Sequence, residues 1–452
     1  LNACLDRITE VTDELKRLMK EFERELAVLK GRVDGLEARV GELEATQFST
    51  TTKLQGDYYW AIGAVVPTAG SSNGAGTGSA DWYKKNYSAT NFVYDARLNL
   101  KTSFTGKDLL RTMLRSGNFG ASGLAGLSTT EVGFEEPAGA NSVAVNRLFY
   151  NFPVGKDFSV TAGAKVRVDD AGMLGMWPSV YPADTVLDFF TYAGAPGAYD
   201  LDGLGAGFGA TYNNVLGFEG VTLSGNYVSI NGDEGTAGLM TDASSSVSVT
   251  QLGYTGGKFP IIGGSAWGAA AAYTYSQNNA LFISTPFAQQ YGGTGSTNSF
   301  GLSGYWVPEN TGWIPSVSTG WGTSSYENAA YNGVAYSTNT NVKAQSWYVG
   351  LQWPDTFVKG NDLGMAVGQA PFITSTGQGP GTGYTGPKQP LDSNYMWEWW
   401  YKFQVTDNIT VTPALYYIQN YDGQLGKLNV STGNYNASDN VFGGLLKTTF
   451  KF

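Results

Sequence analysis

The side chains best suited to act on a solute are charged residues that recur at the spacing of a β-strand. In the segment NFVYDARLNLKT, Asp95, Arg97, Asn99 and Lys101 alternate with apolar residues, and a period of two places alternate side chains on one face of a strand. The basic residues predicted to share this inner face in the early strands are Arg97, Lys101, Arg111, Arg115, Arg147, Lys165 and Arg167. Charged groups around a narrow, water-filled passage set its preference for ions. An alternative of equal weight is that these residues are basic only because side chains that face water must be polar.

Carboxylates that could oppose this basic set are concentrated in one long loop. They are Asp169, Asp170, Asp184, Asp188, Asp200 and Asp202. The loop segment DTVLDFF is predicted to form one or two helical turns after Pro182, which places Asp184 and Asp188, four residues apart, on one face. We expect these carboxylates to face the basic set across a few ångströms of water, against the alternative that the loop lies outside as a lid.

The apolar residues of the same loop indicate how it could be held inside. Val186, Leu187 and Phe190 are predicted to be buried by the helical turns. The following strand, GLGAGFGA, alternates glycine with larger residues, so Gly203 to Gly209 would leave a bare inner face with room for the loop to pack.

Several classes of chemistry are excluded by composition. The chain has no His and one Cys, Cys4, so Ser-His-Asp and Cys-His catalysis and His-dependent zinc sites lack an essential group. A glycosidase that uses two carboxylates passes this filter, but the inner acids are expected in open water rather than in a paired cleft. We therefore predict no enzyme activity, no cofactor and no metal site. Cys4 is interpreted as a lone buried thiol, with pairing outside this chain as the alternative.

The elements that must position these charges are strands. Only 15% of the residues are charged, whereas 61 are Gly, and no run approaches the roughly 18 apolar residues of a transmembrane helix. In WEWWYKFQV, Trp397, Trp399 and Tyr401 alternate with Glu398 and Lys402. Aromatic residues outside and charges inside are typical of a β-barrel in a membrane rather than of a soluble barrel.

Connections between the strand-like segments alternate strictly in length. Seven short connections, for example at 153–157 and 406–408, alternate with eight long ones, of which the acidic loop at 169–203 is the third. This count predicts sixteen antiparallel strands, with both chain ends on the short-turn side, as in bacterial outer-membrane barrels. The last segment, LLKTTFKF, should close the barrel by pairing with the first, near DYYWAIGAVV.

Residues 1–47 have a different composition, with 8 basic and 11 acidic side chains. Apolar residues follow a four-three spacing that is typical of a coiled coil, and opposite charges in pairs such as Glu25 with Lys30 favour parallel helices. The residues predicted to associate are Leu15, Phe22, Leu26, Leu29, Val33, Leu36, Val40 and Leu43. A single amphipathic helix packed on its own protein is the alternative. The predicted domains are thus a coiled-coil stalk, 1–47, and a β-barrel, 48–452.

Four segments resemble one family of proteins. LNACLDRI before the heptads, LLRTMLRSGNF, DFFTYAGAPGAYDLDGLGAGFGATY and LQWPDTFVKGNDLGMAVGQAPF are similar to cyanobacterial outer-membrane porins related to the OprB-type porins. The resemblance implies a homotrimer, passive diffusion and a link to the cell wall through an S-layer-homology (SLH) domain, which in the family precedes the coiled coil and is expected to lie upstream of Leu1. It also implies that the terminal Phe452 serves as the signal read by the assembly machinery.

These observations together predict a trimeric porin in the outer membrane with a stalk in the periplasm. Inorganic ions are the expected solutes, while carbohydrate or iron uptake is the alternative that the family resemblance leaves open. A structural tether or an adhesin is the alternative from another class. The net charge of −10 argues against nucleic acid as a partner.

Overall fold

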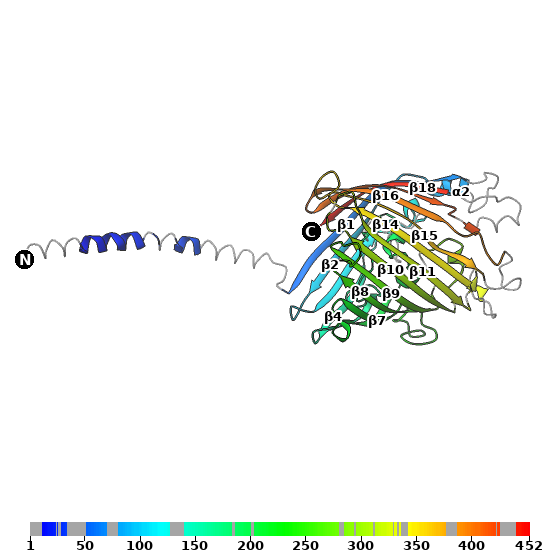
Figure 1. Ribbon diagram of the computed structural model, residues 1–452, viewed down its shortest axis with the longest axis horizontal. Helices are drawn as coiled ribbons and strands as arrows, with labels where there is room; N and C mark the ends of the chain where they lie inside the picture. Colours follow the sequence, from blue (N-terminus) through cyan, green and yellow to red (C-terminus); the bar gives the residue numbers. More distant parts are fainter. Residues whose placement is uncertain are drawn as a thin grey trace, which may run out of the picture. The chain divides into compact units, whose positions relative to one another are not determined.

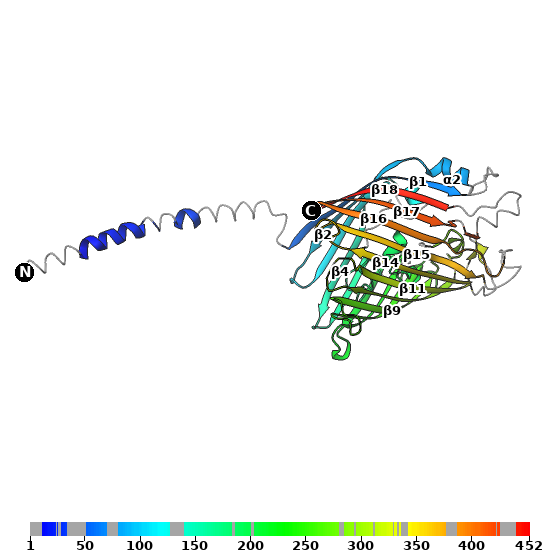
Figure 2. The same ribbon diagram turned by 45° about the horizontal axis from the view of Figure 1, so that its top comes forward.

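The computed structural model describes residues 11–23, 25, 29–33, 51–69, 80–126, 140–182, 186–199, 203–279, 284–292, 295–310, 312–328, 330–331, 334–335, 342–376, 387–421, 423–424 and 440–452. The chain divides into two compact units, Leu1–Lys53 and Leu54–Phe452. The second unit contains a closed antiparallel barrel (Figures 1 and 2). Each strand of the barrel pairs with its neighbours in chain order, and the last pairs with the first.

Sixteen strands form the barrel, which confirms the predicted number. They are β1 (Thr52–Ala69), β2 (Asn91–Thr102), β3 (Leu109–Gly117), β4 (Ala144–Val154), β5 (Phe158–Arg167), β6 (Leu204–Asn213), β7 (Val221–Ser229), β8 (Ser246–Gly256), β9 (Ala266–Gln277), β10 (Ser296–Val307), β11 (Ser316–Glu327), β14 (Val342–Trp353), β15 (Asp362–Ser375), β16 (Tyr395–Thr406), β17 (Ile409–Gln419) and β18 (Asn440–Lys451).

Short elements lie in the connections. A two-stranded sheet is formed by β12 (Ala330–Tyr331) and β13 (Val334–Ala335), and the short helices are α2 (Ala80–Tyr87), α3 (Gly123–Gly126), α4 (Pro196–Tyr199), η1 (Asp188–Thr191), η2 (Val215–Gly217) and η3 (Ala288–Gln290). Among the described residues, no helix combines the length and apolar character needed to cross a membrane.

The barrel closes where the sequence predicts. Strand β18 pairs with β1 from Asp57↔Lys451 through Val66↔Phe442, and Figure 1 shows the two strands side by side. The ladder continues to the last residue, because Gly56 N–H donates to the Phe452 carbonyl at 2.9 Å and Phe452 N–H donates back to the Gly56 carbonyl at 3.1 Å. A Cβ at Gly56 would overlap the Phe452 ring. The ring therefore fits here because Gly56 has no side chain.

Alternation along the strands follows the prediction in β16 but fails in part of β5. Glu398 is fully buried on the inner side of β16, whereas the neighbouring Trp399 is 41% exposed on the outer side. In β5 the ladder is irregular between Gly163 and Val166. Val166 and Val168 are consequently buried in an apolar cluster with Phe149, so the outward orientation that strict alternation from Phe158 predicts for both valines is wrong. A bulge adds one residue to a strand and so reverses the faces beyond it.

The described part of the first unit is helical. Residues 11–23 and 29–33 lie in helix, and Leu15, Phe22, Leu29 and Val33 are exposed by 44–61%. The predicted apolar stripe is therefore on a helix and uncovered in the single chain. Leu26, Leu36, Val40 and Leu43 lie outside the described residues, and association of the helices into a coiled coil stays a prediction.

Candidate functional site

The third long connection, residues 168–203 between β5 and β6, folds into the barrel; we call it the inner loop. Val186, Leu187 and Phe190 have no exposed surface, as the sequence predicts. The helical turn is shorter than expected, because η1 begins at Asp188 rather than directly after Pro182. The inner loop packs against side chains of distant strands, including Tyr348 and Trp400, so it lies inside the barrel and not outside as a lid.

Hydroxyl groups on the barrel wall hold the inner loop by its backbone. Ser303 of β10 donates to the Ala193 carbonyl at 2.7 Å, and Ser346 of β14 donates to the Gly194 carbonyl at 2.8 Å. On β9, Thr274 donates to the carbonyl of Ala198 at 2.8 Å. Buried backbone carbonyls require such donors, and the wall provides them because its inward positions are small and polar.

Glycine on the wall lets the loop approach closely. A Cβ at Gly320 of β11 would overlap the carbonyl oxygen of Ala193. On β6, a Cβ at Gly209 would lie 2.8 Å from the Met173 sulfur, so the predicted bare face of Gly203 to Gly209 is contacted by the inner loop at this position. At these two positions the loop and the wall approach closely because glycine has no side chain.

A buried carboxylate on the wall anchors the middle of the loop. Glu398 of β16 accepts hydrogen bonds from the Tyr181 hydroxyl at 2.6 Å and from the Leu187 N–H at 2.8 Å. The indole N–H of Trp400 donates to the Tyr181 oxygen at 2.8 Å. Burial and the adjacent Glu398 carboxylate raise the pKa of the Tyr181 phenol well above its usual range, so this hydroxyl remains a donor at physiological pH.

The predicted basic set is on the early strands, and its five arginines are paired directly with carboxylates. Arg97 of β2 and Arg115 of β3 both reach Asp95 at 2.7 Å. The Asp95 side chain is completely buried between them. The Arg97 guanidinium also lies 4.8 Å from the centre of the Tyr59 ring, within the range of a cation–π interaction.

A second cluster joins the early strands to the start of the inner loop. Arg111 reaches Asp170 at 3.2 Å, and Arg147 reaches the same carboxylate at 2.7 Å. Arg167 pairs with Asp169. Burial, with the neighbouring Asp169, raises the pKa of the Asp170 carboxyl, while Arg147 opposes the shift. Asp169 and Asp170 thus form direct ion pairs with the basic set, whereas the water gap predicted for Asp184 and Asp188 stays a prediction.

Three further predicted residues that the structure describes lie outside these clusters, and one of them, Lys101, donates to the side-chain oxygen of Gln55 at 2.6 Å. Lys165 lies at the bulge of β5 and is partly exposed. Asp188 lies in the first turn of η1, where its carboxylate accepts a 3.3 Å hydrogen bond from Thr191. Asp184 and Asp200 lie outside the described residues.

Two functional residues, Asp95 and Glu398, were placed on the inner face by the alternation but not assigned to the site. Their signal was an acidic residue on the water-facing side of a strand. That pattern predicts which face of the strand the acid lies on. It does not predict the partner of the acid, because the partners of Asp95 and Glu398 include residues of other elements.

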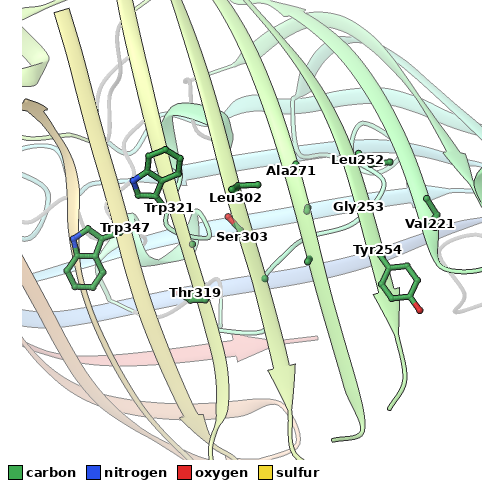
Figure 3. A pocket seen from close by; sticks show the side chains of 14 residues that line it. Val221, Leu252, Gly253, Tyr254, Ala271, Leu302, Ser303, Thr319, Trp321 and Trp347 are labelled. Carbon is green, nitrogen blue, oxygen red and sulfur yellow. The ribbon is translucent and has the colours of Figure 1, made fainter. Parts of the chain in front are cut away.

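The outer wall has a separate apolar groove of about 930 Å³. Figure 3 shows Leu252, Ala271, Leu302 and Trp321 on neighbouring strands around it. The exposed sides of Leu252 and Leu302 belong to the outer face of the barrel, so this groove is not part of the passage.

Comparison with known proteins identifies relatives along the whole chain. The model of the family described as "Carbohydrate-selective porin, OprB family" matches residues 10–452. An uncharacterized protein of Nostoc sp. is 31% identical over 508 aligned residues, covering 100% of this chain and 76% of the relative. An uncharacterized protein of Synechocystis sp. is 29% identical and covers 100% and 80% of the two chains.

Solved structures show the same fold at low sequence identity. The high-pH structure of Pseudomonas putida OprB has a TM-score of 0.55 at 14% identity and covers 91% of this chain and 96% of its own. The trimer form of OmpT from Vibrio cholerae has a TM-score of 0.50 at 9% identity and covers 89% and 99%.

Proposed function

Because the chain belongs to the OprB family and is an outer-membrane porin, we propose that it is a passive channel whose solutes are small carbohydrates rather than mainly inorganic ions. The family match favours this alternative over the ionic solutes that the sequence first indicates. The observation that carries the proposal is the pairing of the basic set with buried carboxylates.

These ion pairs make the passage less suited to select ions by charge. Selection of ions by charge relies on rings of charged side chains. Here Arg97, Arg111, Arg115, Arg147 and Arg167 are paired with Asp95, Asp169 and Asp170. Three carboxylates offset most of the charge of five guanidinium groups, so the field across the passage is reduced.

The same arrangement suits a polar, uncharged solute. An Arg carries five N–H donors in a fixed plane, and the side chains of Arg97 and Arg111 keep 21% and 25% of their surface exposed. A sugar hydroxyl can accept from such donors without having to displace a fixed charge. The carboxylates hold the guanidinium planes in place, so the donors are ordered before a solute arrives.

The test compares two permeabilities of the purified full chain. Liposomes that contain the protein should swell rapidly in an isotonic monosaccharide, while the reversal potential in a potassium chloride gradient should stay close to zero. Rapid swelling together with a small potential supports a carbohydrate channel. A large potential with slow swelling would restore inorganic ions as the principal solutes.

We also propose that the N-terminal helix is a periplasmic stalk that joins three copies of the chain. The support is the exposed apolar stripe of Leu15, Phe22, Leu29 and Val33 on described helix. An uncovered stripe of this kind on a helix is stable in water when other helices bury it. A link to the cell wall through an SLH domain belongs to the same proposal and rests on the family resemblance.

A further inference from the structure

Three buried oxygen atoms near the long-loop end of β16 and β17 accept no hydrogen bond within the described part of the chain. They are Oδ1 of Asp392, Oδ1 of Asn394 and Oδ1 of Asn420. Asp392 and Asn394 are 0% and 1% exposed. Unpartnered acceptors are costly at this depth, and the three of them belong to segments that pack against one another.

The backbone brings the three side chains to the same place. Burial alternates along Asp392, Ser393 and Asn394, so the first and third side chains point the same way. The ladder between β16 and β17 ends with Tyr395↔Gln419, and the next pair outward is Asn394 with Asn420. The Asn420 side-chain amide donates to the Ser393 carbonyl at 2.7 Å, which ties its segment to the Asp392–Asn394 segment.

Other contacts leave the three oxygens as the open acceptors. In Asp392 the other oxygen, Oδ2, accepts from the Thr285 hydroxyl and from the Ile373 N–H, both at 2.7 Å. In Asn420 the donation to Ser393 uses the nitrogen of the amide, so its oxygen faces away from that contact. A Cβ at Gly423 would overlap Asp392 Oδ1, so this oxygen lies close against the segment that follows Asn420.

The charge of Asp392 is only partly compensated. The backbone N–H of Gln424 also approaches the Asp392 carboxylate, but among the described residues no donor forms a hydrogen bond with its Oδ1. Among the ion pairs of the described residues, none involves Asp392. A cation beside Oδ1 would supply the missing compensation.

We propose that Asp392, Asn394 and Asn420 form a binding site for a calcium ion at the long-loop end of the barrel. Calcium takes carboxylate and amide oxygens in flexible arrangements and completes its shell with water. In the part of the chain that the structure describes, no group of three or more Asp, Glu, Cys or His is placed to hold a metal, so this site depends on its amide oxygens.

The site would join three long connections. Asp392 lies in the connection after β15, Thr285 in the one after β9, and Asn420 begins the one after β17. With one carboxylate and two amides, the affinity should resemble that of extracellular calcium modules, with Kd on the order of 10⁻⁴–10⁻³ M. Bound calcium would therefore stabilise the mouth of the barrel where the ion is plentiful.

The test uses terbium as a luminescent substitute for calcium on the full chain in detergent. Tyr395 and Tyr421 each directly follow a proposed ligand and can sensitise a bound terbium ion. We expect saturable luminescence that calcium displaces, and at least a tenfold loss of that signal in both Asp392→Asn and Asn394→Ala. The control Asp242→Asn changes an exposed acid of another long connection and should keep the signal.

Folding of each variant is checked by its β-sheet circular dichroism. If Asp392→Asn fails to fold, Asn394→Ala alone tests the calcium site, because this substitution removes one proposed ligand oxygen and no charge. A displaceable signal of equal strength in Asn394→Ala, or no displaceable signal in the unmodified protein, would overturn the proposal and assign the three oxygens to buried water.

Discussion

Tyr181 of the inner loop donates a 2.6 Å hydrogen bond to Glu398 of β16, across 217 residues of sequence. The same carboxylate accepts the Leu187 N–H, so one buried side chain on the wall holds two points of the loop. We therefore expect the position of the inner loop, and with it the width of the passage, to depend on this contact.

Glu398→Gln tests the anchor. Glutamine retains the shape but places an N–H where one of the two donors now points, so we expect a loss of about 1–3 kcal/mol of loop anchoring. Single-channel conductance should become larger or fluctuate between levels, and larger sugars should enter liposomes faster. The control Glu327→Gln alters an exposed acid at the end of β11. Identical conductance and identical sugar exclusion in the two variants would contradict the role of Glu398.

Asp95→Asn tests the compensation of the basic set. The substitution leaves Arg97 and Arg115 without the carboxylate that both now contact, so positive charge should appear on the wall of the passage. The reversal potential in a potassium chloride gradient should shift toward anion preference by several millivolts or more, and Asp242→Asn should leave it unchanged. If the potential does not move, the Asp95 cluster lies away from the conducting path.

Gly320→Ala tests the close approach of the loop to the wall. Its added methyl group would overlap the Ala193 carbonyl oxygen, so the inner loop must shift and the folded barrel should lose thermal stability. Gly225→Ala is a matched control, because a Cβ there meets nothing within 4 Å. Equal melting temperatures and equal sugar permeability for the two variants would show that the loop does not rest on Gly320.

Deletion of Phe452 tests the closing strand. It removes the two backbone hydrogen bonds with Gly56 and the ring that packs 5.5 Å from that of Tyr58. The amount of protein assembled in the outer membrane should fall far more than after truncation of the long connection between β9 and β10, residues 278–295. Similar assembly of the two variants would rule out a special part for the last residue.

Val33→Cys tests the stalk. A parallel trimer brings the Val33 positions of neighbouring chains together, so oxidation should link subunits in gently solubilised protein. Gly31, two residues earlier, falls on the opposite side of the predicted coiled coil, and Gly31→Cys should form few crosslinks. Monomers alone after oxidation of Val33→Cys would mean that the helix does not associate through this stripe.

Local patterns were sufficient to predict the barrel. The alternation of residues such as Trp399 and Glu398, the strict alternation of short and long connections, and the apolar ending at Phe452 are all readable along the chain. Each is a property of neighbouring residues, because a strand shows its two faces with a period of two and a turn is defined by its own length. The strand number, the closure and the burial of Val186, Leu187 and Phe190 follow from such patterns.

Only the tertiary structure decided how the charges are used. Asp95 and Glu398 are recognisable as acids on the water-facing side of a strand, and Asp170 as an acid of the long loop. Their partners Arg115, Tyr181 and Arg147 come from other elements. The bulge in β5, which turns Val166 inward, likewise has no signature in the local pattern. Whether an acid and a base form a direct ion pair or stay separated by water depends on a few ångströms across the barrel. Strand register and packing of the inner loop on the wall set that distance. The periodicity of a single strand encodes neither of them.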